Sequence, residues 1–320
     1  MRRWNPSHYA ISICVTAALL AGCGGSQPPT GTPGAMRQSR ATVTRAERGG
    51  SWIPAKAKSE DLLYVTEGAK VPIYSYPRGK LEKEIHSYYG NTFEGECADG
   101  RGNVYVIDDN DLTSGNTYIE EYAHGRARSP IRRLFDHLMF DQMCAVDPTS
   151  GDLAVTENDS VKIWHPHANY GKRRRLPDDF ANYACSYDDS GNLFVNGSKP
   201  GSPRDFLLAE LPKGSRTFVA IALPRMQTTA LGPGGIRWDG EYLAFSNRVN
   251  KIYRLTVSGT QARIAGTVDL EEATRVSSIW IHGNTVVGGG YIWDYPAGGK
   301  PIGSIAAGDS AGVAVSVPPH

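Results

Sequence analysis

The sequence has almost no excess charge, no closely paired cysteines and no apolar run long enough for a membrane-spanning helix. Its 34 Lys and Arg residues nearly balance 33 Asp and Glu residues. A dedicated nucleic-acid-binding protein carries a clear basic excess, so we expect no nucleic-acid partner. The five cysteines lack CxxC spacing, which excludes a zinc ribbon and gives no disulfide framework. Glycine and proline are too few for a collagen-like chain, but they suit an all-β protein with many turns.

The N-terminus has the pattern of a secretory signal. Arg2 and Arg3 precede an apolar segment, residues 9–21, that is shorter than the roughly 20 residues a membrane span needs. The following Leu20-Ala21-Gly22-Cys23 resembles the bacterial lipobox, in which the cysteine is diacylated and becomes the new N-terminus. We therefore predict a lipoprotein signal peptide over 1–22 and a lipid (palmitate) on Cys23. The alternative is an ordinary secretory signal with an incidental cysteine.

Residues 23–58 are predicted to be a disordered basic tether behind the lipidated cysteine. The segment GGSQPPTGTPGAM is too poor in large apolar residues to fold. The segment that follows contains one acidic residue, Glu47, and six basic residues: Arg37, Arg40, Arg45, Arg48, Lys56 and Lys58. Such a tether suits an anionic membrane surface, although a soluble spacer fits equally well. Because Gly24 is not Asp, we expect an outer-membrane location in a cell with two membranes.

The rest of the chain, residues 59–320, repeats itself at intervals of about forty to fifty residues. A turn followed by an apolar strand recurs six times, as Asp61-LLYVT, Gly102-NVYVID, Gly151-DLAVTE, Gly191-NLFVNG, Gly240-EYLAFS and Gly283-NTVVGG. A second strand signature follows each of these segments, and a third precedes each turn except the first. Four short strands per unit are typical of a β-propeller blade, so six units predict an all-β, six-bladed β-propeller. A β-sandwich is the structural alternative.

The two ends of the repeat region predict how the ring closes. The first unit, from Asp61, lacks the strand that precedes its turn, and residues 312–317 have the sequence of that strand with nothing after it. We therefore expect the C-terminal strand to pair into the first blade. Closure of this kind leaves no exposed strand edge.

Two of the repeats carry a family resemblance. Cys144-AVDPTSGDLAV and Cys185-SYDDSGNLFV are similar to the GIAVDxxGNVYV pattern of NHL-repeat, YncE-like and SMP-30/gluconolactonase-like propellers. The resemblance covers residues 61–317, and its motifs are architectural. The superfamily includes lactonases, lyases, scaffold proteins and binding modules, so the resemblance implies the fold without selecting a function.

A polar set is predicted at one mouth of the central channel. We align the six innermost strands on one shared position, the slot, which is occupied by Cys97, Cys144, Cys185, Ile236, Ile279 and Val313. The residues three positions before the slot are Glu94, Asp141, Asn182, Pro233, Val276 and Ser310. The oxygens of Glu94, Asp141 and Asn182 are suitable ligands for Ca²⁺ or Mg²⁺. The resemblance to gluconolactonase-like enzymes implies such a metal, but Pro233 and Val276 interrupt the ring. A polar binding rim with Ser310, and simple polarity at the strand entry, are the alternatives.

The shared slot itself holds Cys97, Cys144 and Cys185 in consecutive blades. We interpret them as buried structural thiols, because a free cysteine packs as a small apolar residue. The inner strands are expected to diverge too far for the 3.5–4.5 Å Cβ separation of a disulfide. His165-Pro166-His167 has the spacing of metal ligands, but its place beside Lys172–Arg175 indicates a solvated loop.

Two functions fit this sequence. The first is a membrane-tethered, extracytoplasmic binding or scaffold propeller that needs no cofactor and binds an unknown protein or small molecule. The second is a lactonase or hydrolase in which a divalent metal held by Glu94, Asp141 and Asn182 activates water. The sequence favours the non-enzymatic interpretation, because blade packing already explains the repeated residues.

Overall fold

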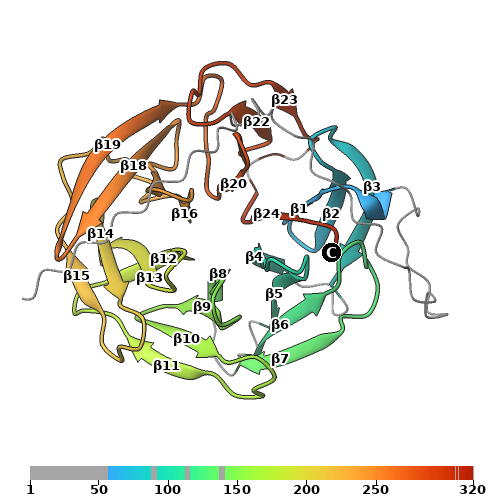
Figure 1. The fold of residues 1–320 in the computed structure, drawn as a ribbon, viewed down its shortest axis with the longest axis horizontal. Helices are drawn as coiled ribbons and strands as arrows, with labels where there is room; N and C mark the ends of the chain where they lie inside the picture. Colours follow the sequence, from blue (N-terminus) through green and yellow to red (C-terminus); the bar gives the residue numbers. More distant parts are fainter. Residues whose placement is uncertain are drawn as a thin grey trace, which may run out of the picture. The chain divides into compact units, whose positions relative to one another are not determined.

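Six four-stranded antiparallel sheets are arranged as blades in a ring (Figure 1). The computed structural model describes residues 57–87, 92–111, 116–136, 141–306, 308 and 310–319. The predicted six-bladed β-propeller is confirmed. The signal peptide, Cys23 and the tether up to residue 56 lie outside the described residues. Among those that are described, no helix has the length and apolar character that crossing a bilayer demands.

The first three blades follow a short 3-10 helix, η1 (Ala57–Ser59). Blade 1 contains β24 (Val313–Ser316), β1 (Leu62–Val65), β2 (Lys70–Ser75) and β3 (Lys80–His86). Blade 2 contains β4 (Thr92–Ala98), β5 (Val104–Asp111), β6 (Asn116–Tyr122) and β7 (Arg132–Asp136). Blade 3 contains β8 (Asp141–Val146), β9 (Leu153–Glu157), β10 (Ser160–Trp164) and β11 (Lys172–Arg175).

The other three blades have the same strand order, with the innermost strand first. Blade 4 contains β12 (Ala181–Tyr187), β13 (Leu193–Lys199), β14 (Ser202–Leu211) and β15 (Val219–Ile221). Blade 5 contains β16 (Ile236–Trp238), β17 (Leu243–Ser246), β18 (Lys251–Ser258) and β19 (Gln261–Asp269). Blade 6 contains β20 (Trp280–His282), β21 (Thr285–Gly288), β22 (Tyr291–Asp294) and β23 (Gly303–Ser304).

The C-terminal strand closes the ring as predicted. Strand β24 pairs antiparallel with β1, from Leu62 opposite Ser316 to Val65 opposite Val313. The Ser316 hydroxyl also donates a hydrogen bond to the carbonyl of Gly102 in blade 2, at 2.5 Å. Gly102 has φ +87°, and a Cβ atom there would lie 2.1 Å from the Val317 carbonyl oxygen, so only glycine fits this contact. The last strand thus joins blade 1 to blade 2.

Aspartates at the repeated turns explain why the turn signature recurs. In blade 2 the Asp99 carboxylate accepts hydrogen bonds from the backbone N–H groups of Arg101, at 2.9 Å, and Asn103, at 2.8 Å. Asp188 in blade 4 makes the equivalent bonds to Ser190 and Asn192. A short acidic side chain can satisfy a turn backbone in this way. The repeated aspartates are therefore structural.

A second repeated feature is a β-bulge in the inner strands of blades 2, 3 and 4. The register shifts between Phe93 and Glu96 in β4, between Asp141 and Cys144 in β8, and between Asn182 and Cys185 in β12. A bulge leaves one residue without its ladder partner. Polar side chains of the second strand compensate, since Thr156 accepts the Met143 N–H at 3.1 Å and Asn196 accepts the Ala184 N–H at 2.9 Å.

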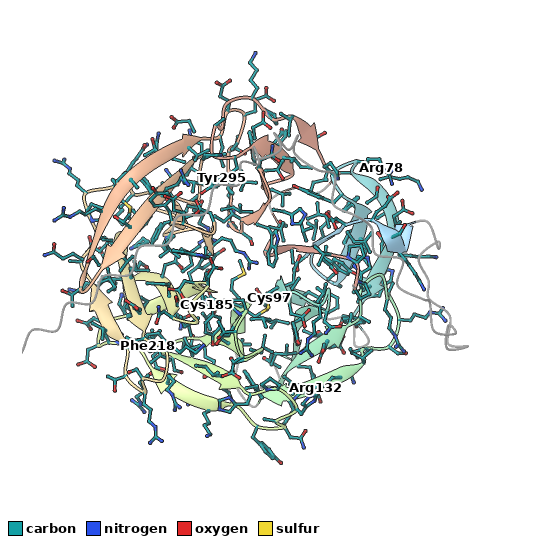
Figure 2. All side chains as sticks on the ribbon, viewed as in Figure 1. Arg78, Cys97, Arg132, Cys185, Phe218 and Tyr295 are labelled. Atoms are coloured by element: carbon teal, nitrogen blue, oxygen red, sulfur yellow. A yellow bond between two sulfur atoms is a disulfide. The ribbon has the colours of Figure 1, made fainter. Side chains whose placement is uncertain are left out.

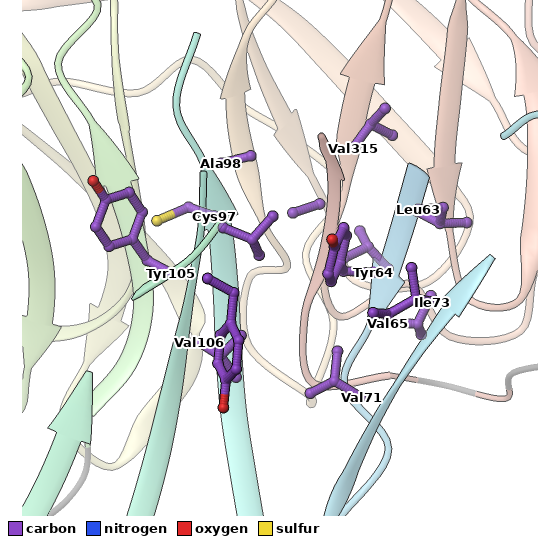
Figure 3. Packing of buried hydrophobic residues seen from close by; sticks show 14 of the residues in the cluster. Leu63, Tyr64, Val65, Val71, Ile73, Cys97, Ala98, Tyr105, Val106 and Val315 are labelled. Carbon is purple, nitrogen blue, oxygen red and sulfur yellow. The ribbon is translucent and has the colours of Figure 1, made fainter. Parts of the chain in front are cut away.

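Apolar side chains fill the space between neighbouring blades. Figure 3 shows this packing between blades 1 and 2, where Leu63, Tyr64 and Val315 lie opposite Cys97, Tyr105 and Val106. All four residues of β1 and all four of β24 are buried. Each blade therefore depends on its neighbours for its core, and the inner strands are held at fixed positions around the channel.

Candidate functional site

A cavity of about 1060 Å³ opens where the inner strands of the blades end. Its wall includes residues at or near the ends of those strands, namely Ala98, Val146, Tyr187, Trp238, His282 and Val315. We call it the Arg237 cavity, after one of the three arginines in its wall, Arg101, Arg132 and Arg237. This volume is close to the upper end of the range found for small-molecule sites.

The inner strands leave room at this end because one position is small in most blades. The residue directly after the shared slot is Ala98, Ala145 and Ser186 in blades 2, 3 and 4, and all three line the cavity. Blades 5 and 6 instead place Arg237 and Trp280 there. The cavity therefore has small side chains on one side and a large cation and indole on the other.

Arg237 stacks on the face of Trp280. The Arg237 Cζ atom lies 3.4 Å from the centroid of the Trp280 ring, a cation–π arrangement. Burial lowers the pKa of Arg237 to about 10, while the nearby Cys185 acts in the opposite sense. The side chain remains a cation at neutral pH. Within the part of the chain that the structure describes, no carboxylate pairs with its guanidinium.

Two aspartates of the wall, Asp99 and Asp147, accept hydrogen bonds from their own turns. Asp99 binds the backbone of its own turn. Asp147 accepts hydrogen bonds from the backbone N–H of Thr149, at 2.8 Å, and from the Ser150 hydroxyl, at 2.7 Å. Burial alone raises the pKa of Asp147, but these hydrogen bonds outweigh it and lower the pKa. Neither carboxylate acts as a counter-ion for Arg237.

The remaining two lining carboxylates also have local partners. Asp189 accepts a hydrogen bond from the Trp238 indole N–H at 2.9 Å. Glu121 hydrogen bonds to Tyr105, and burial raises the pKa of Glu121 although the cationic Arg132 opposes this. The four acidic side chains of the wall thus have other partners, and no carboxylate of the described residues compensates the charge of Arg237.

Histidines contribute to the rim of the Arg237 cavity. His282 Nε2 lies 2.8 Å from the Asp61 carboxylate, and His165 Nδ1 lies 2.9 Å from that of Asp152. His165, Pro166 and His167 all line the cavity. All three are exposed, in agreement with the predicted solvated loop, and the sequence did not indicate that this loop lines the cavity.

Two of the three slot cysteines are not the free thiols that the sequence predicted. Cys97 and Cys144 form a disulfide, with their Cα atoms 5.5 Å apart, and Cys185 is a buried free thiol. The expectation that the inner strands diverge too far is wrong for β4 and β8. The strands approach closely because Gly95 has no side chain: a Cβ atom there would lie 2.2 Å from the Gln142 carbonyl oxygen. Figure 2 shows Cys97 and Cys185 on the inner side of the ring.

The predicted polar rim belongs to the other ends of the inner strands. Asn182 lies five residues before Tyr187 in β12, which corresponds to roughly 15 Å along a strand. Its amide group is buried and donates hydrogen bonds to the carbonyls of Glu157, at 2.5 Å, and Ser160, at 2.9 Å. Asn182 therefore bridges blades 4 and 3.

The other members of the rim occupy unequal backbone positions. Asp141 and Asn182 are paired in their ladders with Glu157 and Gly197, whereas Glu94 lies inside the bulge of β4. Ser310 is buried, and its hydroxyl has no hydrogen-bond partner among the described residues. The structure describes the backbone of Asp141 but not its side chain. A shared site formed by Glu94, Asp141, Asn182 and Ser310 stays a prediction.

The metal expectation also remains untested. Among the side chains that the structure describes, no group of three or more His, Cys, Asp or Glu residues is arranged to hold a metal ion. Because the Asp141 side chain is outside that set, binding of Ca²⁺ or Mg²⁺ by Glu94, Asp141 and Asn182 stays a prediction.

Comparison with known proteins identifies the fold. The ring is similar to a chain in the crystal structure of a nidogen/laminin complex, with 13% identity, a TM-score of 0.61, and coverage of 81% of this chain and 100% of that one. It is also similar to a protein of unknown function from Bacteroides caccae, with 11% identity, a TM-score of 0.59, and coverage of 81% and 99%.

A third similar structure is the β-propeller domain of Cps50 (Swd1) from Myceliophteria thermophila, with 12% identity, a TM-score of 0.53, and coverage of 81% and 86%. No family model and no curated protein matches the sequence. At these identities the structural likeness supports the propeller fold and carries no function with it.

Proposed function

We propose that this protein is a lipid-anchored, extracytoplasmic propeller that binds a ligand in the Arg237 cavity. One observation carries the proposal: a cavity of about 1060 Å³ at a channel mouth, whose wall includes aromatic side chains and Arg237 stacked on Trp280. Ligand sites combine apolar walls with a few polar groups in this manner. The lining carboxylates are used by turns and neighbours, which favours binding over acid–base catalysis.

The disulfide supports the proposed compartment. Bonds such as Cys97–Cys144 form and persist mainly outside the reducing cytosol. The lipobox-like sequence around Cys23 independently predicts export and attachment to a membrane. Both features agree with a protein of the bacterial cell envelope, at the outer membrane where a cell has two.

The membrane anchor is tested by replacing Cys23 with Ser. The parent chain should partition into the detergent phase and carry the mass of attached acyl chains. The Cys23→Ser variant should lose the acyl mass. A parent chain without acyl mass, or a variant with an unchanged one, contradicts lipidation at Cys23.

The binding site is tested by comparing the two mouths of the channel. A small-fragment library is screened by ligand-observed NMR against the parent chain, Trp238→Ala and Asn182→Ala. Trp238 lines the Arg237 cavity, while Asn182 belongs to the opposite strand ends. We expect hits that survive Asn182→Ala and are lost in Trp238→Ala. Hits with the reverse pattern move the site to the predicted rim of Glu94, Asp141, Asn182 and Ser310.

A further inference from the structure

Arg237 is held in one orientation by the blade that follows it. Strand β16 places the residue opposite Ala244, and Trp280 from β20 covers the guanidinium at 3.4 Å. The N–H groups of a guanidinium lie in its plane and form a rigid fork that matches a carboxylate or phosphate. Stacking covers a face of this plane, so the donors at its edge remain suited to a ligand.

The charge balance at this position is unusual. Arg237 is half-buried, and removing a cation from water is unfavourable unless it is paired or hydrogen bonded. The lining carboxylates are occupied by the turns and by Tyr105 and Trp238. Since the arginine stays protonated at neutral pH, an anion that enters the cavity relieves this cost.

The opposite wall leaves space for such an anion. Ala98, Ala145 and Ser186 take the equivalent position in blades 2, 3 and 4. Trp238 and Tyr187 lie one position further along their strands and also line the cavity. Arg101 and Arg132 also line the cavity, but Arg237 is the arginine that stacks on an aromatic ring of the wall. The cavity therefore places a stacked, forked cation beside apolar and aromatic surface.

We infer that the Arg237 cavity selects ligands that carry an oxyanion group, a carboxylate, phosphate or sulfate, attached to an apolar or ring-bearing body. Arg237 binds the oxyanion through its paired N–H groups, and Trp280 keeps the guanidinium in place. Trp238 and Tyr187 contact the body of the ligand. This inference rests on the proposed function, because it names the ligand class of the same cavity.

The test uses matched probes of one size. Benzoate, phenyl phosphate and neutral benzamide are titrated into the full chain, purified in detergent, by isothermal titration calorimetry with micelles alone as the blank. We expect benzoate and phenyl phosphate to bind at least about tenfold more tightly than benzamide, because charge-assisted forked hydrogen bonds are stronger than neutral ones. Comparing benzoate with phenyl phosphate separates carboxylate from phosphate ligands.

The variants assign the preference to one side chain. Arg237→Met should remove the tenfold preference, whereas Arg263→Met, an exposed arginine of the same blade, should leave it unchanged. Arg237→Lys keeps the charge but not the fork and should retain only part of the preference. Near-ultraviolet circular dichroism checks that each variant is folded.

The outcomes separate this inference from the proposed function. If all three probes bind equally and Trp238→Ala abolishes their binding, the cavity is a binding site but the oxyanion inference is wrong. An oxyanion preference that persists in Arg237→Met also overturns the inference. If neither anionic probe binds the folded parent, the inference is overturned on the parent chain alone.

Discussion

Blades 2, 3 and 4 differ from blades 5 and 6 at the channel. The inner strands of the first group have seven, six and seven residues, each with a bulge and a cysteine in the shared slot. The inner strands of blades 5 and 6 have three residues each and contain Arg237, Trp238, Trp280 and His282. We call the two groups the regular and the divergent blades.

This difference distinguishes residues that repeat for structural reasons from residues that line the candidate site. In the regular blades, the repeated residues satisfy turns, bulges and the packing of neighbouring sheets. In the divergent blades, the same positions carry a cation and large aromatic rings, and these line the Arg237 cavity. The regular blades thus build the ring, and the departures from the repeat create its candidate site.

The largest expected effect comes from opening the ring. Strand β24 packs against β4 of a regular blade and β20 of a divergent one. Deletion from Gly312 onward removes Val313 and Val315, each worth about 1.5–3 kcal/mol of burial, and exposes the edge of β1. We expect the free energy of unfolding to fall by about 5 kcal/mol or more, or cooperative unfolding to disappear. Guanidinium chloride unfolding measures this change.

A shorter truncation is the control for that deletion. Removing residues 318–320 leaves all of β24 in place, so its unfolding midpoint should match that of the parent. If deletion from Gly312 onward is also harmless, the ring does not depend on this closure.

The second effect distinguishes the three slot cysteines of the regular blades. The disulfide spans 47 residues, and a loop of that length predicts about 4 kcal/mol of stabilisation. Cys97→Ala combined with Cys144→Ala should therefore lower the free energy of unfolding by about that amount. Cys185→Ala removes a buried thiol with no bond and should cost only about 1 kcal/mol. Equal losses in the two variants would show that the disulfide contributes nothing specific.

The fold was predictable from sequence because its repeat is a physical requirement. Each tight turn needs a residue such as Gly102 or Gly191 with positive φ, and aspartates such as Asp188 to bind the turn backbone. The glycine recurs in blades 2 to 6 and the aspartate in blades 2 to 5, so the blades could be counted. The first unit lacks the strand that precedes its turn, which indicated the closing strand. Four-stranded sheets and the pairing of β24 with β1 follow the prediction.

The candidate site was not predicted, because its key residues stand directly after the slot, at a position that does not repeat from blade to blade. The change from Ala98, Ala145 and Ser186 to Arg237 and Trp280 was visible in the sequence. Its meaning depends on whether those side chains face a cavity, which spacing alone does not determine. The disulfide was missed for a similar reason: the distance between neighbouring inner strands depends on the close approach at Gly95.

The third effect concerns a buried acid in a regular blade. Burial raises the pKa of Glu96 well above its ordinary value of 4.5, although a hydrogen bond from Thr66 opposes the shift. The folded state therefore holds this proton more tightly than the unfolded state. Stability falls as the pH rises from about 4.5 through the higher folded pKa. Glu96→Gln should raise the free energy of unfolding at pH 8 by about 1–3 kcal/mol, with little difference at pH 4.

Urea unfolding between pH 4 and pH 8 measures this prediction. Glu271→Gln, at an exposed position, is the matched control and should leave the pH dependence unchanged. A Glu96→Gln variant that follows the parent curve at every pH would show that the Glu96 carboxyl titrates normally.

The smallest expected effect compares two arginines within one divergent blade. Arg254 pairs with the buried Asp239 carboxylate at 2.9 Å and contacts the ring of Tyr242, so Arg254→Met leaves a carboxylate with fewer partners. Among the described residues Arg237 stacks on Trp280 and pairs with no carboxylate, and methionine preserves much of that contact while removing the charge. Arg237→Met should therefore change the free energy of unfolding by less than about 1 kcal/mol, and Arg254→Met should cost more. Urea unfolding at pH 7 ranks the two variants. A larger loss for Arg237→Met would assign Arg237 to the framework of the ring, and the contrast between regular and divergent blades would then lose its functional meaning.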